Sequence, residues 1–248
     1  MRNFIRQIIL ALPTWFRTHL LQLLLTIRVA GIVFAALALW IFAEIAEDVL
    51  EKESQSIDTA ILLLLRSLHS PPLDQFMLGI TFWGEPSVLL IICLLLGIWW
   101  LIKQQRAEAT TLAIAGVGAL GLNYLLKVLF GRARPALWER VLDVGQYSFP
   151  SGHAMISMVI YGMIGYFLVK RFPRWRVLTI IGTVLLITII GLSRLYLGVH
   201  WPTDVLAGYA GGIVWLTTCI FSLEIWQERR SSDGFLEDES LSPEPSEQ

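Results

Sequence analysis

The 248-residue chain is 55% hydrophobic and 16% charged, with a formal net charge of −1. Soluble domains carry about 25% charged residues, so this composition excludes an ordinary soluble enzyme. The near-neutral charge gives no overall basic field that would point to nucleic acid. The mean hydropathy of +0.64 instead indicates a single bundle of membrane helices. The two cysteines, Cys93 and Cys219, lie in apolar runs and are expected to be small core side chains.

The first 28 residues form a basic segment that contains no acidic residue. Pro13 interrupts its early apolar run, which does not fit a cleaved signal peptide. We expect one or two amphipathic helices at the membrane interface, leading into the first span, with a frayed tail as the alternative. The cations of the segment are Arg2, Arg6, Arg17 and Arg28.

Six apolar runs are long enough for membrane-spanning helices once their Ser, Thr and Gly residues are included. A spanning helix needs about 20 mostly apolar residues, and backbone groups in hydrocarbon must pair internally. The sequence therefore predicts an all-α fold, a six-transmembrane-helix bundle over residues 29–226 with interfacial amphipathic helices. The predicted spans are Val29–Ile45, Thr81–Ile102, Ala109–Phe130, Ser151–Val169, Val177–Leu192 and Thr203–Leu223.

The distribution of charge predicts the orientation of this bundle. Lys and Arg residues follow the second, fourth and sixth spans, whereas residues 44–85 are rich in acids. Because positive loops stay in the cytoplasm, we expect both termini there and the loops after spans one, three and five outside. Residues 57–68 predict an amphipathic surface helix too short to cross the membrane, and the acidic residues 227–248 predict a disordered cytoplasmic tail.

Polar and ionisable residues gather at four of the predicted span ends. Because successive spans alternate in direction, the end of span three, the start of span four, the end of span five and the start of span six all lie on the outer face. Ionisable groups at membrane depth are costly and usually functional, so this convergence predicts one site. Its members are Lys127, Arg132, Arg134, Ser151, His153, Ser193, Arg194, His200 and Asp204.

Three of these cations indicate an anion site. Lys127 offers a point charge, whereas Arg134 and Arg194 each offer a planar fork for two phosphate oxygens. Ser151 is a natural N-cap, and the free N–H groups of the helix that follows it favour phosphate. Gly152 lets the backbone approach such a ligand closely.

The two histidines of this group are expected to have separate roles. Asp204 follows His200 by four residues, and a carboxylate on one imidazole nitrogen leaves the other free to attack. His153 has no such partner in the sequence and is the better proton donor to a leaving oxygen. A metal site using the two histidines and Asp204 is the alternative, but the three cations would repel a divalent ion. Ser151 as a nucleophile would need a base and an oxyanion hole.

Three motifs in this region resemble those of the type 2 phosphatidic acid phosphatases. They are Lys127-Val-Leu-Phe-Gly-Arg-Ala-Arg134-Pro135, Pro150-Ser151-Gly152-His153, and Ser193-Arg194 followed by His200 and Asp204. All three occur in the family's order and spacing. The six-span layout extends the likeness to about residues 29–223.

This resemblance implies a metal-independent lipid phosphatase, without a cofactor, that works through a phosphohistidine intermediate. Carried over by position, His200 is the nucleophile, Asp204 its orienting partner and His153 the general acid. The phosphate is held by Lys127, Arg134, Ser151, Gly152 and Arg194. Arg132 is not a motif position and is expected to be solvated or to face headgroups, with substrate contact as the alternative. Asn123 is expected either to orient Lys127 or to hydrogen-bond between helices.

Soluble acid phosphatases and vanadium haloperoxidases share these motifs, but the six apolar spans argue against both. The expected partners are the lipid bilayer and a phosphorylated lipid: undecaprenyl pyrophosphate, phosphatidylglycerol phosphate, phosphatidate or phosphorylated lipid A. We expect an integral protein of the cell (inner) membrane with its site on the periplasmic, extracytoplasmic face. An anionic-lipid transporter or flippase, or an enzyme that transfers phosphate to lipid A, could use the same cations, and the sequence does not indicate an oligomeric state.

Overall fold

The computed structural model describes residues 14–138 and 145–240 of the chain, and the regular secondary structure within them is helical apart from one isolated β-bridge between Ala133 and Tyr147. This confirms the predicted all-α fold. The helices are α2 (Thr14–Glu51), α3 (Gln55–Arg66), α4 (Pro71–Phe82), α5 (Pro86–Ile102), α6 (Arg106–Phe130), α7 (Gly152–Arg171), the 3-10 helix η1 (Pro173–Trp175), α8 (Arg176–Tyr196) and α9 (Pro202–Ser240).

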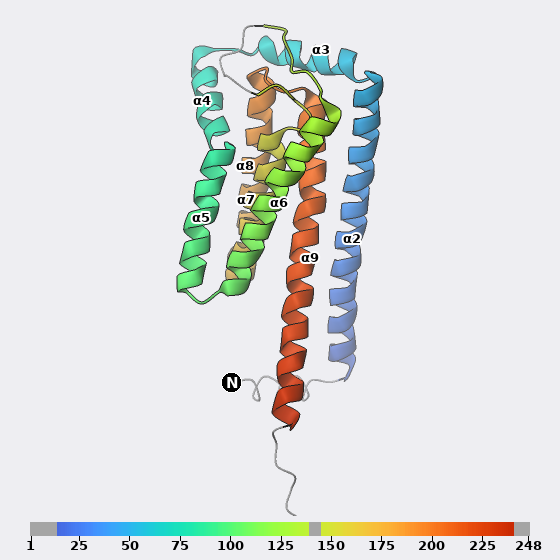
Figure 1. The fold of residues 1–248 in the computed structure, drawn as a ribbon, viewed down its shortest axis with the longest axis vertical. Helices are drawn as coiled ribbons and strands as arrows, with labels where there is room; N and C mark the ends of the chain where they lie inside the picture. Colours follow the sequence, from blue (N-terminus) through green and yellow to red (C-terminus); the bar gives the residue numbers. More distant parts are fainter. Residues whose placement is uncertain (1–13, 139–144, 241–248) are drawn as a thin grey trace, which may run out of the picture.

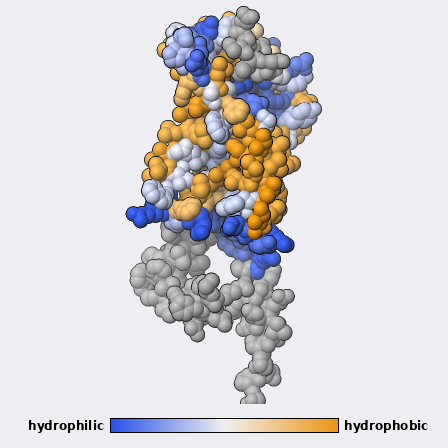
Figure 2. Space-filling view, turned by 90° about the vertical axis from the view of Figure 1, so that its left-hand side faces the viewer, coloured by the Kyte–Doolittle hydropathy of each residue, from blue (hydrophilic) through white to orange (hydrophobic). Residues whose placement is uncertain are grey.

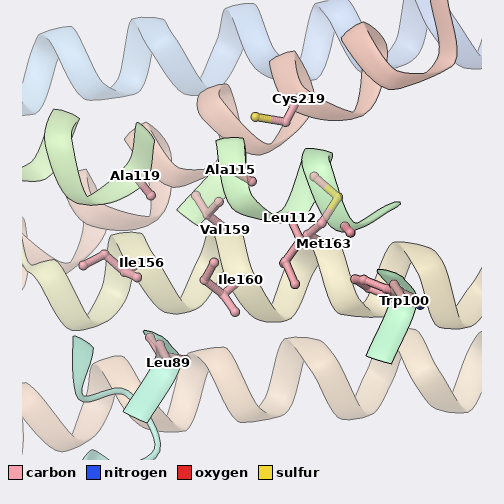
Figure 3. Packing of buried hydrophobic residues seen from close by; sticks show 11 residues of the cluster. Leu89, Trp100, Leu112, Ala115, Ala119, Ile156, Val159, Ile160, Met163 and Cys219 are labelled. Carbon is pink, nitrogen blue, oxygen red and sulfur yellow. The ribbon is translucent and has the colours of Figure 1, made fainter. Parts of the chain in front are cut away.

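The long helices stand side by side, with α7 at the centre and α3 lying across one end (Figure 1). Helix α7 packs against α5, α6, α8 and α9. In its most apolar window 56% of the residues are buried inside the protein, against 11% for α2. Figure 3 shows the main core, in which α7 presents Ile156, Val159, Ile160 and Met163 to Leu112 and other residues of α5, α6 and α9.

On the face shown in Figure 2, hydrophobic side chains predominate across the middle of the molecule, with hydrophilic side chains gathered at both ends of this band. Five helical stretches in the described part of the chain are long and apolar enough to cross a membrane. The pair α4 and α5 gives a sixth span if it is counted as one broken span. The chain is thus an integral membrane protein.

The expectation of one unbroken second span is wrong. Helices α4 and α5 meet at 46°, with the break just before Pro86. Proline has no N–H to continue the helical ladder and disfavours helical geometry in the residue before it, and Glu85 accordingly has an extended ψ of 128°. The break leaves the side chains of Thr81 and Glu85 on the wall of a cavity at this end of the bundle.

Two predicted segment boundaries fall inside long helices. Helix α2 begins at Thr14, so the predicted boundary at residue 28 lies within it, and residues 1–13 are outside the described part. Helix α9 continues to Ser240, beyond the boundary expected at 227, and residues 241–248 are likewise outside. The predicted surface helix at 57–68 corresponds to α3, which buries Asp58 and Leu62.

Candidate active site

The four predicted span ends meet at the end of the bundle covered by α3 (Figure 1). They border a cavity of about 460 Å³ at the break between α4 and α5. Six of the predicted site residues line this cavity: Lys127, Arg134, Gly152, His153, Arg194 and His200. Ser151 and Asp204 are fully buried behind them. The predicted convergence of these four helix ends is thus present in the structure.

His200 and Asp204 form a buried pair at the start of α9. The helix begins at Pro202, between the two residues, so His200 stands in the preceding turn and Asp204 in the first helical turn. Their side chains are joined by Nδ1 of His200 and Oδ2 of Asp204, 3.2 Å apart. Oδ2 also accepts a hydrogen bond of 2.9 Å from the backbone N–H of Trp201. A carboxylate on Nδ1 fixes the tautomer in which Nε2 carries the lone pair.

The other nitrogen of His200 faces the guanidinium of Arg134. Nη1 of Arg134 lies 3.1 Å from Nε2 of His200 and donates a hydrogen bond of 2.7 Å to the carbonyl oxygen of Val199. Burial and the nearby charges, Arg134 first among them, lower the pKa of His200 well below its usual value. His200 is therefore neutral near pH 7 and retains a lone pair for attack.

Backbone carbonyls and a hydroxyl hold in place the three cations that the sequence predicts to bind phosphate. Nζ of Lys127 donates to the carbonyl of Tyr147 at 2.9 Å. Nε of Arg134 donates to the carbonyl of Gly145 at 2.5 Å. Nη1 of Arg194 donates to Oγ1 of Thr81 at 2.6 Å. Helix α6 ends before Gly131, so Lys127 reaches the cavity from a helix and Arg134 from the loop behind it.

The start of α7 is fastened to both neighbouring helices. Ser151 is its N-cap, with Oγ accepting from the N–H of Ala154 at 3.4 Å and its own N–H donating to the carbonyl of Asp204 at 2.9 Å. Asn123 of α6 donates to the carbonyl of Pro150 at 3.3 Å and lies 3.7 Å from Sδ of Met155 in α7, so it links α6 to the start of α7, in line with the expected contact between helices.

His153 has a partner that sequence spacing did not reveal. Its Nε2 lies 3.2 Å from Oε2 of Glu85, within ion-pair distance but without hydrogen-bond geometry. Glu85 is 68 positions away in the chain and reaches the cavity only because the second span is broken there. An acidic residue directly before a proline in an apolar run was the available signal.

The expectation that Arg132 faces solvent or headgroups is wrong. Its guanidinium is mostly buried and binds two carboxylates at 2.7 Å each, those of Asp58 and Asp204. Asp58 belongs to the amphipathic helix α3 and was not a predicted site residue. Arg132 is not among the residues that line the cavity.

An all-helical membrane bundle that holds three cations, two histidines and a buried aspartate around one cavity defines a membrane-embedded phosphohydrolase. The comparisons with known proteins give the family: this chain belongs to the PAP2 superfamily, whose family model matches residues 107–227. The predicted resemblance is thus confirmed, and the chain is a lipid phosphatase.

Two relatives and one solved structure illustrate the similarity. Phosphatidylglycerophosphatase B of Bacillus subtilis (strain 168) is 36% identical over 165 residues, which cover 64% of this chain and 80% of that protein. Undecaprenyl-diphosphatase of Sulfolobus acidocaldarius is 34% identical over 149 residues, which cover 56% of this chain and 66% of that protein. The crystal structure of a transmembrane PAP2 type phosphatidylglycerolphosphate phosphatase from Bacillus subtilis matches with a TM-score of 0.71 and 29% identity, over 79% of this chain and 96% of that one.

Proposed function

We propose that this chain dephosphorylates phosphatidylglycerol phosphate at the cavity bounded by His200, His153 and the three cations. The observation that carries the proposal is the convergence on one cavity of a buried, neutral His200, a second histidine and the side chains of Lys127, Arg134 and Arg194. The choice of lipid follows the similarity to a relative and a solved structure, both from Bacillus subtilis, whose names include that substrate.

In the first chemical step, Nε2 of His200 attacks phosphorus, so that a P–N bond forms while the P–O bond to the lipid alcohol breaks. His153 donates a proton to the departing oxygen, which leaves as the alcohol. The phosphorylated imidazole keeps its proton on Nδ1 and is cationic, and Asp204 stabilises that charge at 3.2 Å. Attack requires Nε2 to exchange its contact with Arg134 for the phosphorus atom, while Arg134 turns to the phosphate oxygens.

In the second step, water attacks phosphorus and His153 accepts a proton from it. The P–N bond breaks, inorganic phosphate leaves, and the lone pair returns to Nε2 of His200. His153 is therefore acid and then base, as microscopic reversibility requires. The same cations neutralise the charge on the equatorial oxygens in both steps, which is the main task of a phosphoryl-transfer site.

Unsatisfied donors support an anionic ligand in this cavity. Nε of Arg194 is buried and has no hydrogen-bond partner within the described residues, and Nε2 of His153 has only the carboxylate of Glu85 at 3.2 Å, without hydrogen-bond geometry. Buried polar atoms in folded proteins almost always have a hydrogen-bond partner. Phosphate oxygens are suitable acceptors for both, and three cationic side chains supply the positive charge that a metal ion gives in other phosphatases. We therefore propose catalysis without a metal.

An apolar groove beside the cavity suits the hydrocarbon part of the substrate. It has a volume of about 430 Å³, runs between α5 and α6, and is lined at its base by Ile156 and Ile160 of α7. Pro86 borders both this groove and the catalytic cavity. A lipid could thus present its phosphate to His200 while its chains stay among apolar side chains.

The substrate assignment is tested by phosphate release from purified protein supplied with phosphatidylglycerol phosphate, phosphatidate and undecaprenyl pyrophosphate, in EDTA without added metal. We expect turnover of all three in the chelator, with the highest kcat/KM for phosphatidylglycerol phosphate. A higher kcat/KM for undecaprenyl pyrophosphate would assign the chain to the other group of relatives. Loss of activity in EDTA would overturn the metal-free mechanism.

We also propose that the cavity opens on the extracytoplasmic face and that both termini are cytoplasmic. The end of the bundle opposite the cavity carries the basic loop between α7 and α8, and positive loops stay inside. Labelling intact cells with a membrane-impermeant thiol reagent tests this. A cysteine replacing exposed Glu53, at the cavity end, should be labelled, and one replacing Arg174 should be labelled only after lysis. The reverse pattern would invert the topology.

A further inference from the structure

Arg132 joins two buried carboxylates from distant parts of the chain. Its Nη2 lies 2.7 Å from Oδ2 of Asp58 on α3, and its Nη1 lies 2.7 Å from Oδ1 of Asp204 on α9. The side chains of Asp58 and Asp204 are 1% and 0% exposed, so neither carboxylate has water as an alternative partner. Removing the guanidinium would leave two buried like charges without their counter-ion.

The hydrogen bonds on Asp204 divide its two oxygens between separate tasks. Oδ1 accepts from Arg132, whereas Oδ2 accepts from the backbone N–H of Trp201 and faces Nδ1 of His200. The carboxylate cannot rotate about its Cβ–Cγ bond without breaking the contact to Arg132. Arg132 thereby determines which oxygen faces the imidazole, and from which direction.

Asp58 fastens the same network to the first turn of α9. Its Oδ1 accepts from the backbone N–H of Thr203 at 3.1 Å, and its Oδ2 accepts from the hydroxyl of Thr203 at 2.6 Å. Nη1 of Arg132 also donates to that hydroxyl, at 2.7 Å. A carboxylate at a helix N-terminus is a favourable partner for its free N–H groups. Helix α3 thus holds the turn that carries Asp204.

The position of Arg132 separates it from the phosphate-binding cations. Arg134, two residues later, lines the cavity, but Arg132 does not. Its guanidinium carbon lies 5.5 Å from the ring centroid of the buried Trp201. Its hydrogen bonds of 2.7 Å are to the carboxylates of Asp58 and Asp204 and to the hydroxyl of Thr203.

We propose that Arg132 and Asp58 are positioning residues that hold Asp204, and through it His200, in the geometry for attack on phosphorus. This inference rests on the proposed roles of His200 and Asp204. In this proposal the interfacial helix α3 supports catalysis, because Asp58 lies in its first turn. Neither residue touches the substrate, so both should influence the rate of the phosphoryl transfer rather than the binding of the lipid.

The experiment compares the purified variants Arg132→Met and Asp58→Asn with wild type, using phosphatidylglycerol phosphate as the substrate. The matched control is Glu53→Gln, which makes the same chemical change on an exposed residue just before α3. We expect kcat and the rate of acid-labile phosphoenzyme formation to fall about 10- to 100-fold in both variants, as for other partners that orient a reacting group. We expect KM to change less than about twofold, and Glu53→Gln to match wild type.

A double-mutant cycle shows whether these residues act through Asp204. If they do, Arg132→Met should lower kcat far less in an Asp204→Asn background than in wild type. An equal factor in both backgrounds, wild-type kcat in both single variants, or a raised KM with unchanged kcat would overturn the proposal. If Arg132→Met does not fold, Asp58→Asn, which keeps the side-chain size, supports the same cycle. Turnover that survives His200→Ala would instead overturn the proposed function itself.

Discussion

Nδ1 of His200 lies 3.2 Å from Oδ2 of Asp204 across the start of α9, with both side chains buried. This contact directs Nε2 towards the cavity. It predicts that replacing His200 and replacing Asp204 affect turnover and phosphoenzyme formation differently. His200→Ala removes the proposed nucleophile, so turnover should fall by on the order of 10³ or more and no phosphoenzyme should form. Asp204→Asn keeps that nucleophile but loses the charge opposite the phosphorylated imidazole, so a phosphoenzyme should still form, more slowly.

Acid-quenched single-turnover reactions with radiolabelled lipid phosphate distinguish these outcomes. His69→Ala is the control, because His69 lies at the same end of the bundle and contacts Tyr196 instead of the cavity. A labelled phosphoenzyme in His200→Ala would contradict the assignment of the nucleophile.

Arg134 should not tolerate replacement by lysine, although the charge is kept. Its guanidinium has one nitrogen near His200 and another on the Gly145 carbonyl, an arrangement that needs a planar fork. Lysine offers a single point of positive charge and cannot make both contacts or bind two phosphate oxygens side by side. We expect kcat/KM to fall about 10²-fold. Steady-state kinetics measure this, with Arg176→Lys at the other end of the bundle as a control.

The sequence predicted that the candidate site residues would meet at one cavity, because they belong to short motifs at helix ends. Lys127 and Arg134 lie seven positions apart, and Asp204 follows His200 by four. The local chain geometry therefore largely determines the relative position of the residues in each pair. Alternating span direction then brings the four ends together, and the structure agrees with this.

The sequence could not predict the residues that support the cluster from a distance. The pairing of Arg132 with Asp58 spans 74 positions and depends on α3 folding across the end of the bundle. The sequence around Arg132 is equally compatible with an exposed arginine beside lipid headgroups and with a buried arginine between two carboxylates. Glu85 was missed for a related reason, since hydropathy alone reads its surroundings as one unbroken span.

The lowered pKa of His200 predicts a specific pH dependence of stability. The unfolded chain takes up a proton on this histidine near pH 6.5, whereas the folded protein, with its His200 pKa well below that value, does not. The unfolded state therefore binds more protons, and the free energy of unfolding falls as the pH drops below about 6.5, by up to about 1.4 kcal/mol per pH unit. His200→Gln removes this contribution.

Thermal unfolding in detergent at pH 7 and pH 5 measures the effect. We expect the drop in Tm between the two pH values to be larger for wild type than for His200→Gln. Equal drops in the two proteins would mean that His200 takes up its proton in the folded state as well.

The close approach of α7 and α9 predicts that Gly208→Ala damages both stability and activity. A Cβ built on Gly208 lies 2.8 Å from the carbonyl oxygen of Ser151 and 2.9 Å from Cβ of Ala154. The first of these is backbone, so the helices must separate. One turn earlier on α9, the N–H of Ser151 donates to the carbonyl of Asp204, and separation strains that contact.

Overpacking of this kind costs about 1 to 3 kcal/mol, so we expect a Tm several degrees below wild type. Because α7 carries His153 and α9 carries Asp204, turnover should also fall at temperatures where the variant is fully folded. Gly182→Ala on α8 is the control, since a Cβ there meets nothing within 4 Å, and it should match or exceed wild type in Tm. If Gly208→Ala were as stable and as active as Gly182→Ala, the close contact between α7 and α9 would not determine the relative positions of His153 and Asp204.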